Sequence, residues 1–314
     1  MSSPPPQTPV SDAPGALLED SVVEYRHDDW HTPPLESDWA AVDLENGRVL
    51  NFSRLAFPLD PPEVALLTTT LAGRAKNISF DPHRGTLKGH DSGVDVALLT
   101  TLLQRFADAA QHFVHGLLPD YAPALRRART SLRPVEAAGR IRSVNQDDTR
   151  LHIDAFPATP TGGGRILRLF SNIDPQGRAR QWRVGEPFEA YASHFVPAIK
   201  PPFPGSATLL WALKLTKTRR TLYDHYMLSL HRLGKADDHY QSHTPQREVA
   251  FAAGSTWVAF TDQVLHAVSG GQYLLEQTFH LPPHIQRRPD SAPLAVLERL
   301  TGRVLAPRST AESP

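Results

Sequence analysis

Cysteine is absent from this chain of 314 residues, which excludes disulfides, thiolate metal sites and a cysteine nucleophile. Any metal ion must therefore be held by His, Asp or Glu. The 33 basic and 33 acidic residues balance, so no global field points to nucleic acid or to a membrane. No apolar run approaches the ~20 residues needed to span a bilayer, and the first residues, MSSPPPQTPVSDAPG, lack the basic start and apolar core of a signal peptide. We therefore expect a soluble intracellular protein.

Recognisable nucleotide and hydrolase motifs are also missing. The chain has no serine nucleophile elbow, no phosphate-binding glycine loop and no dinucleotide fingerprint. The function must come from another kind of site.

The order of the patterns predicts a mainly β fold with flanking helices. Residues 1–16 are rich in Pro and Ser and predict a disordered tail. Apolar residues at helical spacing predict a long helix over about 94–116, and short strand-like runs separated by turns follow from about 249. Such strands favour a jelly-roll or cupin-like core, the double-stranded β-helix. We expect one domain over 17–285, with a helical elaboration at about 58–130, a β-core at about 131–285, and a C-terminal helix and tail at 286–314.

A His-x-Asp pair, His152 and Asp154, ends a β-like run at the centre of the chain. Residues i and i+2 of a strand point to the same face, so the imidazole and the carboxylate would lie side by side. A late histidine, His266, would complete the 2-His-1-carboxylate face of a non-haem Fe(II) oxygenase, which leaves positions open for O₂ and a cosubstrate. The same three residues also suit Zn²⁺. In a chain with 15 histidines they could also be unrelated residues, and these alternatives stay open.

An oxygenase of this kind needs a cation for the far carboxylate of its cosubstrate. Arg165 and Arg168 lie in the strand-like run after the pair, but with opposite parity, so only one can face the interior. A buried arginine needs an anion to satisfy it. We favour Arg168, with Asn172 on the same face, because Arg165 lies at the glycine-rich start of the run, where it can reach solvent.

Two basic segments stand out on the neutral chain. One spans 125–142 and the other 209–235, and either could be a solvated face or a wall that binds anions, since guanidinium groups match carboxylate and phosphate. The candidate substrate residues in these segments are Arg127, Arg133, Arg142, Lys217 and Arg220.

Several long blocks resemble the Kdo hydroxylases, Fe(II)/2-oxoglutarate dioxygenases that act on 3-deoxy-D-manno-octulosonic acid (Kdo) in bacterial lipopolysaccharide. They are TSLRP (130–134), DDTRLHIDAFPATPTGGGRILRLFSNIDP (147–175), RQWRVGEPFE (180–189), YDHYMLSLH (223–231) and GSTWVAFTDQVLHAVSGGQYLLEQTFHLP (254–282). The resemblance implies hydroxylation of Kdo at carbon 3, giving Ko in the lipid A inner core, with Fe(II), 2-oxoglutarate and O₂. It also implies that His152, Asp154 and His266 are the iron ligands. The substrate would be Kdo-lipid A, not nucleic acid, and the protein would be cytoplasmic and peripheral at the inner membrane.

One position departs from the wider oxygenase pattern. Many members place the 2-oxoglutarate arginine about ten residues after the second histidine, where this chain has Glu276, with Thr278 beyond it. We therefore expect Arg168 (or Arg165) to hold the cosubstrate, with Asn172 and Thr278 as further contacts, and Glu276 to pair with an arginine. The alternatives are an oxygenase that acts on another anionic substrate, or a non-catalytic cupin-like protein that binds a sugar or lipid.

Overall fold

The computed structural model describes residues 18–32, 34, 37–68, 70–72, 75, 77–139 and 143–307. The expected tail at 1–16 and the candidate substrate residue Arg142 lie outside these ranges. Within them, no helix is both long enough and apolar enough to cross a membrane.

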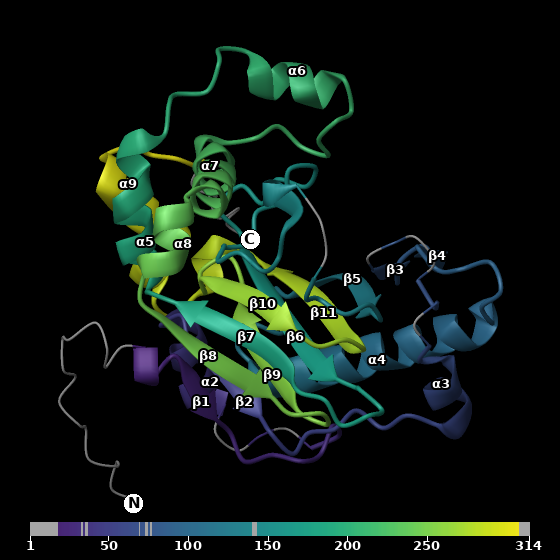
Figure 1. Ribbon diagram of the computed structural model, residues 1–314. Coiled ribbons are helices and arrows are strands. Elements are labelled where there is room, and N and C mark those ends of the chain that lie inside the picture. Colours follow the sequence, from purple (N-terminus) through teal and green to yellow (C-terminus); the bar gives the residue numbers. More distant parts are fainter. Residues whose placement is uncertain are drawn as a thin grey trace, which may run out of the picture.

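Two β-sheets form the centre of the molecule (Figure 1). The large sheet has eight strands in the order β1-β2-β9-β6-β11-β5-β3-β4, and the small sheet has three in the order β10-β7-β8. Neighbouring strands are antiparallel, except for the parallel pair β1 and β2. The strands are β1 (Val22–Glu24), β2 (Val49–Phe52), β3 (Ile78–Asp81), β4 (Thr86–Lys88), β5 (Arg126–Arg133), β6 (Arg165–Asn172), β7 (Arg180–Gly185), β8 (Gln246–Phe251), β9 (Thr256–Phe260), β10 (His266–Gly270) and β11 (Leu274–Leu281).

The two sheets pack face to face over a shared aromatic cluster. Phe170 and Trp257 of the large sheet meet Trp182 and Phe251 of the small one. This arrangement of two antiparallel sheets confirms the predicted mainly β, jelly-roll fold. The large sheet extends beyond the range expected for the core, because β1 to β4 come from the N-terminal part of the chain.

The outer face of the large sheet is covered by a long helix, α4 (Val96–Leu117), within two residues of the predicted bounds at each end. Asp95 caps the helix, since its carboxylate accepts a hydrogen bond from the N–H of Leu98. Strand β6 alternates between the two sides of the sheet: Leu167 and Leu169 pack in the cluster with α4, while Phe170 packs against the small sheet. The sequence parity therefore decides which arginine of β6 faces the interior.

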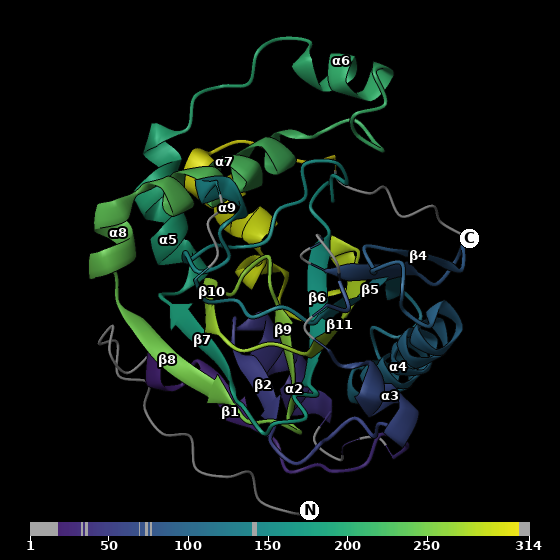
Figure 2. The same ribbon diagram turned by 45° about the vertical axis from the view of Figure 1, so that its right-hand side comes forward.

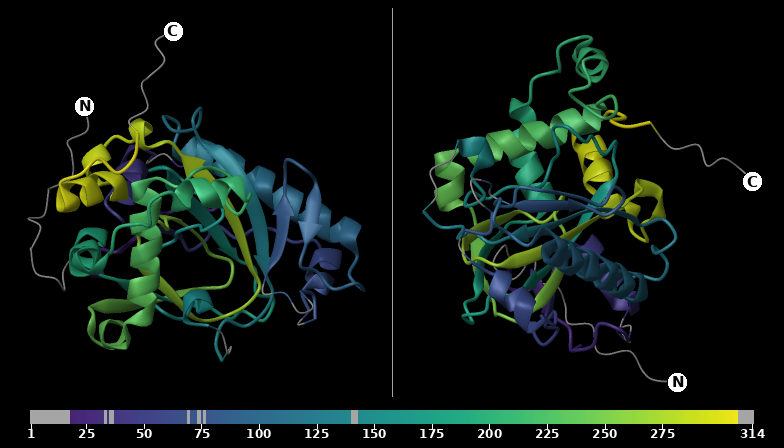
Figure 3. Two further views of the ribbon diagram at one scale, coloured as in Figure 1. Left: turned by 90° about the horizontal axis from the view of Figure 1, so that it is seen from above. Right: turned by 90° about the vertical axis from the view of Figure 1, so that its right-hand side faces the viewer.

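Helices α2 and α3 pack beside α4, whereas α5, α7, α8 and α9 gather at one end of the sandwich (Figures 1 and 2). Helices α5, α7 and α9 pack together with Leu151, Ile153 and Leu265, next to the site described below. Helix α6 projects beyond these helices, away from the sheets, in Figures 1 and 2 and in the right-hand view of Figure 3. The helices are α2 (Ser37–Glu45), α3 (Pro61–Leu66), α5 (Phe188–Phe195), α6 (Ser206–Ala212), α7 (Leu222–Ala236), α8 (Asp238–His243) and α9 (Pro293–Thr301), with 3₁₀ turns η1 (Val144–Gln146), η2 (Val196–Ala198), η3 (Pro283–Ile285) and η4 (Pro289–Ser291).

Candidate metal centre

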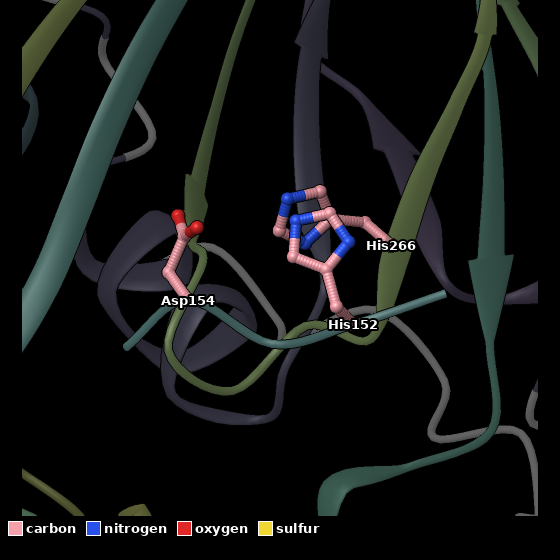
Figure 4. Close-up of side chains that lie close together, drawn as sticks. All are labelled: His152, Asp154 and His266. Atoms are coloured by element: carbon pink, nitrogen blue, oxygen red, sulfur yellow. The ribbon is translucent and has the colours of Figure 1, made fainter. Parts of the chain in front are cut away.

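The three predicted ligands meet at one end of the sandwich (Figure 4). His266 is the first residue of β10, and His152 is joined to it by an isolated antiparallel bridge. The N–H of each histidine donates to the carbonyl of the other, both at 2.9 Å, and the N–H of Asp154 donates to the carbonyl of Thr261 at 2.8 Å. The segment around the pair is thus a single bridge and not the strand that was expected, but its backbone is fixed to the end of the sheet.

The side chains of this cluster converge on one space (Figure 4). Their ligand atoms all lie within 4.8 Å of one another, and among the described residues this is the only such group of three or more. The centroids of the two imidazole rings are 4.7 Å apart. All three residues are buried, at 5%, 8% and 4% exposure for His152, Asp154 and His266.

Each histidine is held with the same ring nitrogen available. Nδ1 of His152 donates to the carbonyl of Arg150 at 2.7 Å, and Nδ1 of His266 donates to the carbonyl of Val264 at 2.8 Å. Because a carbonyl only accepts, the proton lies on Nδ1 and the lone pair on Nε2. Burial lowers the pKa of both imidazoles, and His266 lowers that of His152 further. Both rings are therefore neutral at neutral pH, which is the form that binds a metal.

Asp154 supplies the negative charge of the cluster. Burial alone would raise its pKa, but the positive charge of Arg168 is the largest of the effects that more than offset this, so that the pKa lies below its ordinary value. Its Oδ2 is buried without a hydrogen-bond partner, although Nε of Arg168 lies 3.2 Å away. Two neutral imidazole nitrogens and one under-satisfied carboxylate oxygen are a donor set that fits Fe(II).

A ring and a cavity border the cluster. Trp182 of β7 stacks on His266 with ring centroids 5.0 Å apart and an interplanar angle of 21°. Beside the cluster is a cavity of about 190 Å³, whose walls include Arg133, Arg168 and Arg180. This volume is suited to a small cosubstrate and not to a whole glycolipid.

Arg168 faces the cluster from β6, as parity predicted. Its Nη1 lies 3.2 Å from Oε1 of Glu276, whose Oε2 accepts from Nε of Arg133 at 2.8 Å. The prediction that Glu276 pairs with an arginine is confirmed. A row of alternating charge, Asp154–Arg168–Glu276–Arg133, therefore runs beside the cavity, and all of its members except Glu276 line the cavity wall.

Arg165 does not reach solvent, and that expectation was wrong. Its side chain is fully buried on the opposite face of β6, where Nε binds Asp262 at 2.7 Å and Nη2 binds Gln263 at 2.6 Å. The guanidinium also lies over the ring of Phe260, 3.9 Å from its centroid. The turn after β9 supplies an anion that the sequence pattern did not reveal, so Arg165 is a structural residue outside the cavity.

The other predicted cosubstrate contacts lie away from the cavity wall. The amide of Asn172 donates to the carbonyls of Arg178 and Phe251, so it ties backbone segments together. Thr278 is buried opposite Arg168 in the β6–β11 ladder and is not among the residues that line the cavity.

The structure disperses the predicted substrate residues. Arg133 lines the cavity, but Arg127 pairs with Asp108 on the outer side. The backbone N–H of Lys217 donates to the carbonyl of Ala158, and the guanidinium of Arg220 donates to that of Pro157. Both residues therefore lie near the loop that follows Asp154, here called the ligand loop, but outside the cavity wall.

Helix α7 contributes two residues that the sequence reasoning missed. His231 and Lys235, one helical turn apart, both line the cavity. The ring of His231 lies edge-on to His152, at a centroid distance of 5.3 Å, and its Nδ1 donates to the carbonyl of Ile153. Burial lowers the pKa of Lys235 to about 8 despite nearby Asp154 and Asp147. The i, i+4 spacing was visible in the sequence, but nothing there indicated which face of α7 meets the site.

Comparison with known proteins points in one direction. The family described as 3-deoxy-D-manno-oct-2-ulosonic acid (Kdo) hydroxylase matches residues 27–304. The chain is 48% identical in sequence to the Kdo hydroxylase KdoO, a non-haem Fe(II) α-ketoglutarate-dependent dioxygenase, whose crystal structure was solved in complex with cobalt(II). The match covers 94% of this chain and 99% of that one, with a TM-score of 0.89. The same enzyme in complex with α-ketoglutarate and Fe(III) matches 93% of this chain and 99% of that one at 48% identity, with a TM-score of 0.87. No curated protein matches the chain.

Proposed function

The chain belongs to the Kdo hydroxylase family and is a non-haem Fe(II)- and 2-oxoglutarate-dependent dioxygenase, and on that premise we propose that it hydroxylates Kdo at carbon 3 to give Ko in the lipid A inner core of lipopolysaccharide. The substrate contains Kdo. The position of hydroxylation, the lipid A carrier and the place of action at the inner membrane are the proposed part.

The observation that carries the proposal is the convergence of His152, Asp154 and His266 beside a small cavity with cationic walls. We assign these three residues as the ligands of Fe(II). Both imidazoles present Nε2, and the carboxylate of Asp154 is ionised, so these three residues would hold Fe(II) through two nitrogens and one oxygen. Bound Fe(II) supplies the oxidation, in which O₂ converts 2-oxoglutarate to succinate and CO₂ and places one oxygen atom on a C–H bond of the sugar.

The chain's own residues then position the reactants. Arg168 is the proposed anchor for the far carboxylate of 2-oxoglutarate. Its Nε and Nη1 are turned to Asp154 and Glu276, and Nη2 is assigned to the cosubstrate. Arg133 and Lys235 add positive charge on other walls of the same cavity, which favours an acidic sugar at its mouth.

The glycolipid carrier agrees with the distribution of charge. Kdo is a carboxylic acid and lipid A is phosphorylated, and the chain, neutral as a whole, concentrates Lys217, Arg219 and Arg220 next to the loop that follows Asp154. We propose that the enzyme is cytoplasmic and works on the inner-membrane surface, where the protein contacts the membrane without crossing it.

The test is succinate production from 2-oxoglutarate under air with Fe(II), with and without Kdo₂-lipid A, beside His152→Ala. Turnover that rises with the glycolipid and vanishes in the variant supports the whole proposal. Turnover that is independent of the glycolipid supports the oxygenase activity but indicates another anionic acceptor. Mass spectrometry of the product locates the new hydroxyl group, and an oxygen at a carbon other than 3 overturns that part of the proposal.

A further inference from the structure

The segment from 200 to 220, here called the arm, carries an unusual concentration of exposed apolar side chains. Phe203 is 86% exposed. Four further large apolar residues of the arm are about half exposed or more: Leu209 (59%), Trp211 (49%), Leu213 (60%) and Leu215 (59%). No residue of α6 is buried, and the figures show it well separated from the sheets (Figures 1 and 3). Contiguous exposed apolar groups of this kind mark an interaction surface.

The arm is nevertheless an ordered element. Helix α6 ends with two hydrogen bonds, from the N–H of Leu215 to the carbonyl of Leu210 at 3.0 Å and from the N–H of Lys214 to that of Trp211 at 2.9 Å. Together they form a Schellman ending, in which the residue after the helix is left-handed. That residue is Lys214 (φ 57), not the glycine that adopts this conformation at lower cost. The helix ending therefore holds a cation, Lys214, next to the uncharged residues 201–213, here called the apolar tip.

Charge surrounds the apolar tip without entering it. Residues 201–213, PPFPGSATLLWAL, contain no charged side chain, and no Asp or Glu occurs from 190 to 223. The cations that flank the tip are Lys200, Lys214, Lys217, Arg219 and Arg220. The guanidinium groups of Arg219 and Arg220 hydrogen-bond to neutral oxygens, those of Thr208 and Pro157, so their charge faces an outside partner uncompensated by these contacts.

The arm lies on the same side as the ligand loop. Its basic end is hydrogen-bonded to Pro157 and Ala158, which follow Asp154 closely in the chain, and it runs directly into α7, which carries His231 and Lys235 of the cavity wall. Between the arm and α7 is a hollow of about 490 Å³, lined by Leu210 and Leu233 together with the cationic Lys200, Arg220 and Arg232. A hollow lined by apolar and cationic side chains suits a lipid headgroup that carries phosphate.

We propose that the arm inserts its apolar tip into the interface of a bilayer that contains anionic lipids, with its flanking cations on the headgroups. An apolar tip bordered by cations matches the two forces that hold proteins at such an interface, burial of apolar area and attraction to anionic lipid. The inference deepens the proposed function and rests on it for the membrane-bound acceptor, since insertion of the arm brings a glycolipid headgroup to the cavity.

The direct test is sedimentation of the full chain with vesicles of phosphatidylcholine alone, or of phosphatidylcholine and phosphatidylglycerol in equal parts. We expect binding to the anionic vesicles that weakens as salt is raised. The double change Trp211→Ser and Leu213→Ser should weaken it about tenfold or more, the scale expected when two large apolar groups are no longer buried. Phe203→Ser is an independent second variant. Trp39→Ser is the matched control, because Trp39 is also exposed (59%) but lies on α2, and it should bind like the unchanged protein.

Three results overturn the proposal: no binding to anionic vesicles by the unchanged protein, equal loss of binding in the Trp39→Ser control, or arm variants that alter oligomeric state while vesicle binding stays intact. Failure of the proposed function is seen separately, because vesicle binding needs neither Fe(II) nor 2-oxoglutarate. With both, the arm variant should retain turnover on a delipidated Kdo acceptor and lose it on the acceptor embedded in vesicles.

Discussion

The guanidinium of Arg168 lies 3.2 Å from the carboxylate of Asp154, so the proposed cosubstrate anchor touches a proposed metal ligand. The contact keeps the pKa of Asp154 below its ordinary value and the carboxylate ready for a cation. It also means that metal binding and cosubstrate binding share a residue, and experiments on Arg168 must measure the two separately.

Arg168→Ala is expected to weaken the binding of 2-oxoglutarate about ten- to a hundredfold, because a charge-assisted hydrogen bond to the carboxylate is lost. The affinity should be measured on the Co(II)-loaded protein, after Co(II) binding itself has been titrated. Arg127→Ala is the matched control, since Arg127 is a strand arginine that pairs with Asp108 outside the cavity. An unchanged affinity for 2-oxoglutarate in Arg168→Ala would refute the assignment.

Arg165→Met is expected to reduce stability by about 3–5 kcal/mol, the range for breaking a buried ion pair, because Asp262 is then left buried without its partner. Burial already raises the pKa of Asp262 against the opposing effect of Arg165. Denaturant unfolding measures the loss, and the folded variant should keep its affinity for 2-oxoglutarate. A variant of normal stability that no longer binds 2-oxoglutarate would restore Arg165 as the anchor.

Removal of the metal is expected to leave the fold intact. The backbones of His152 and His266 are bonded to one another, so the site is held by the sheet and not by the ion. Co(II) should add stability by mass action, about 2.7 kcal/mol at a free concentration a hundred times its dissociation constant. Thermal unfolding with chelator and with Co(II) measures this gain, and His152→Ala should abolish it. A chelated protein without cooperative unfolding would contradict the prediction.

Lys235 predicts a pH dependence of stability. Its pKa is about 8 in the folded chain and about 10.4 when unfolded, so between these values the unfolded state binds more protons. The cost of burying the ammonium is therefore present below pH 8, and it is relieved as the pH rises towards 10.4. Compared with Lys235→Met, the chelated protein should gain unfolding free energy over this window. Parallel stability curves for the two proteins would show that Lys235 has an ordinary pKa.

The sequence allowed the three-residue cluster to be predicted because its parts are chemically distinctive. A His-x-Asp pair followed by glycines, with a late histidine, is recognisable without knowledge of the fold. The assignment of Arg168 to the interior followed from the two-residue period of a strand, which is a local property.

Features that depend on contacts between distant segments could not be predicted in this way. The burial of Arg165 depends on Asp262 and Gln263 in a turn that is remote in sequence. The face of α7 that brings His231 and Lys235 to the cavity is set by how the helix packs on Leu151 and Ile153. The N-terminal strands β1 and β2, three and four residues long, are too short to show a period.

The stacking of Trp182 on His266 allows metal binding to be followed by tryptophan fluorescence. An open-shell ion bound at His266 would lie within quenching range of the excited indole, so loading with Co(II) should dim the intrinsic fluorescence of the chain. The loss of fluorescence on Co(II) binding should be smaller in Trp182→Phe. Trp257, whose ring lies 5.6 Å from that of Trp182, can transfer excitation to Trp182 in the unchanged protein. Occupancy of the site can then be followed in real time with no added dye and no turnover.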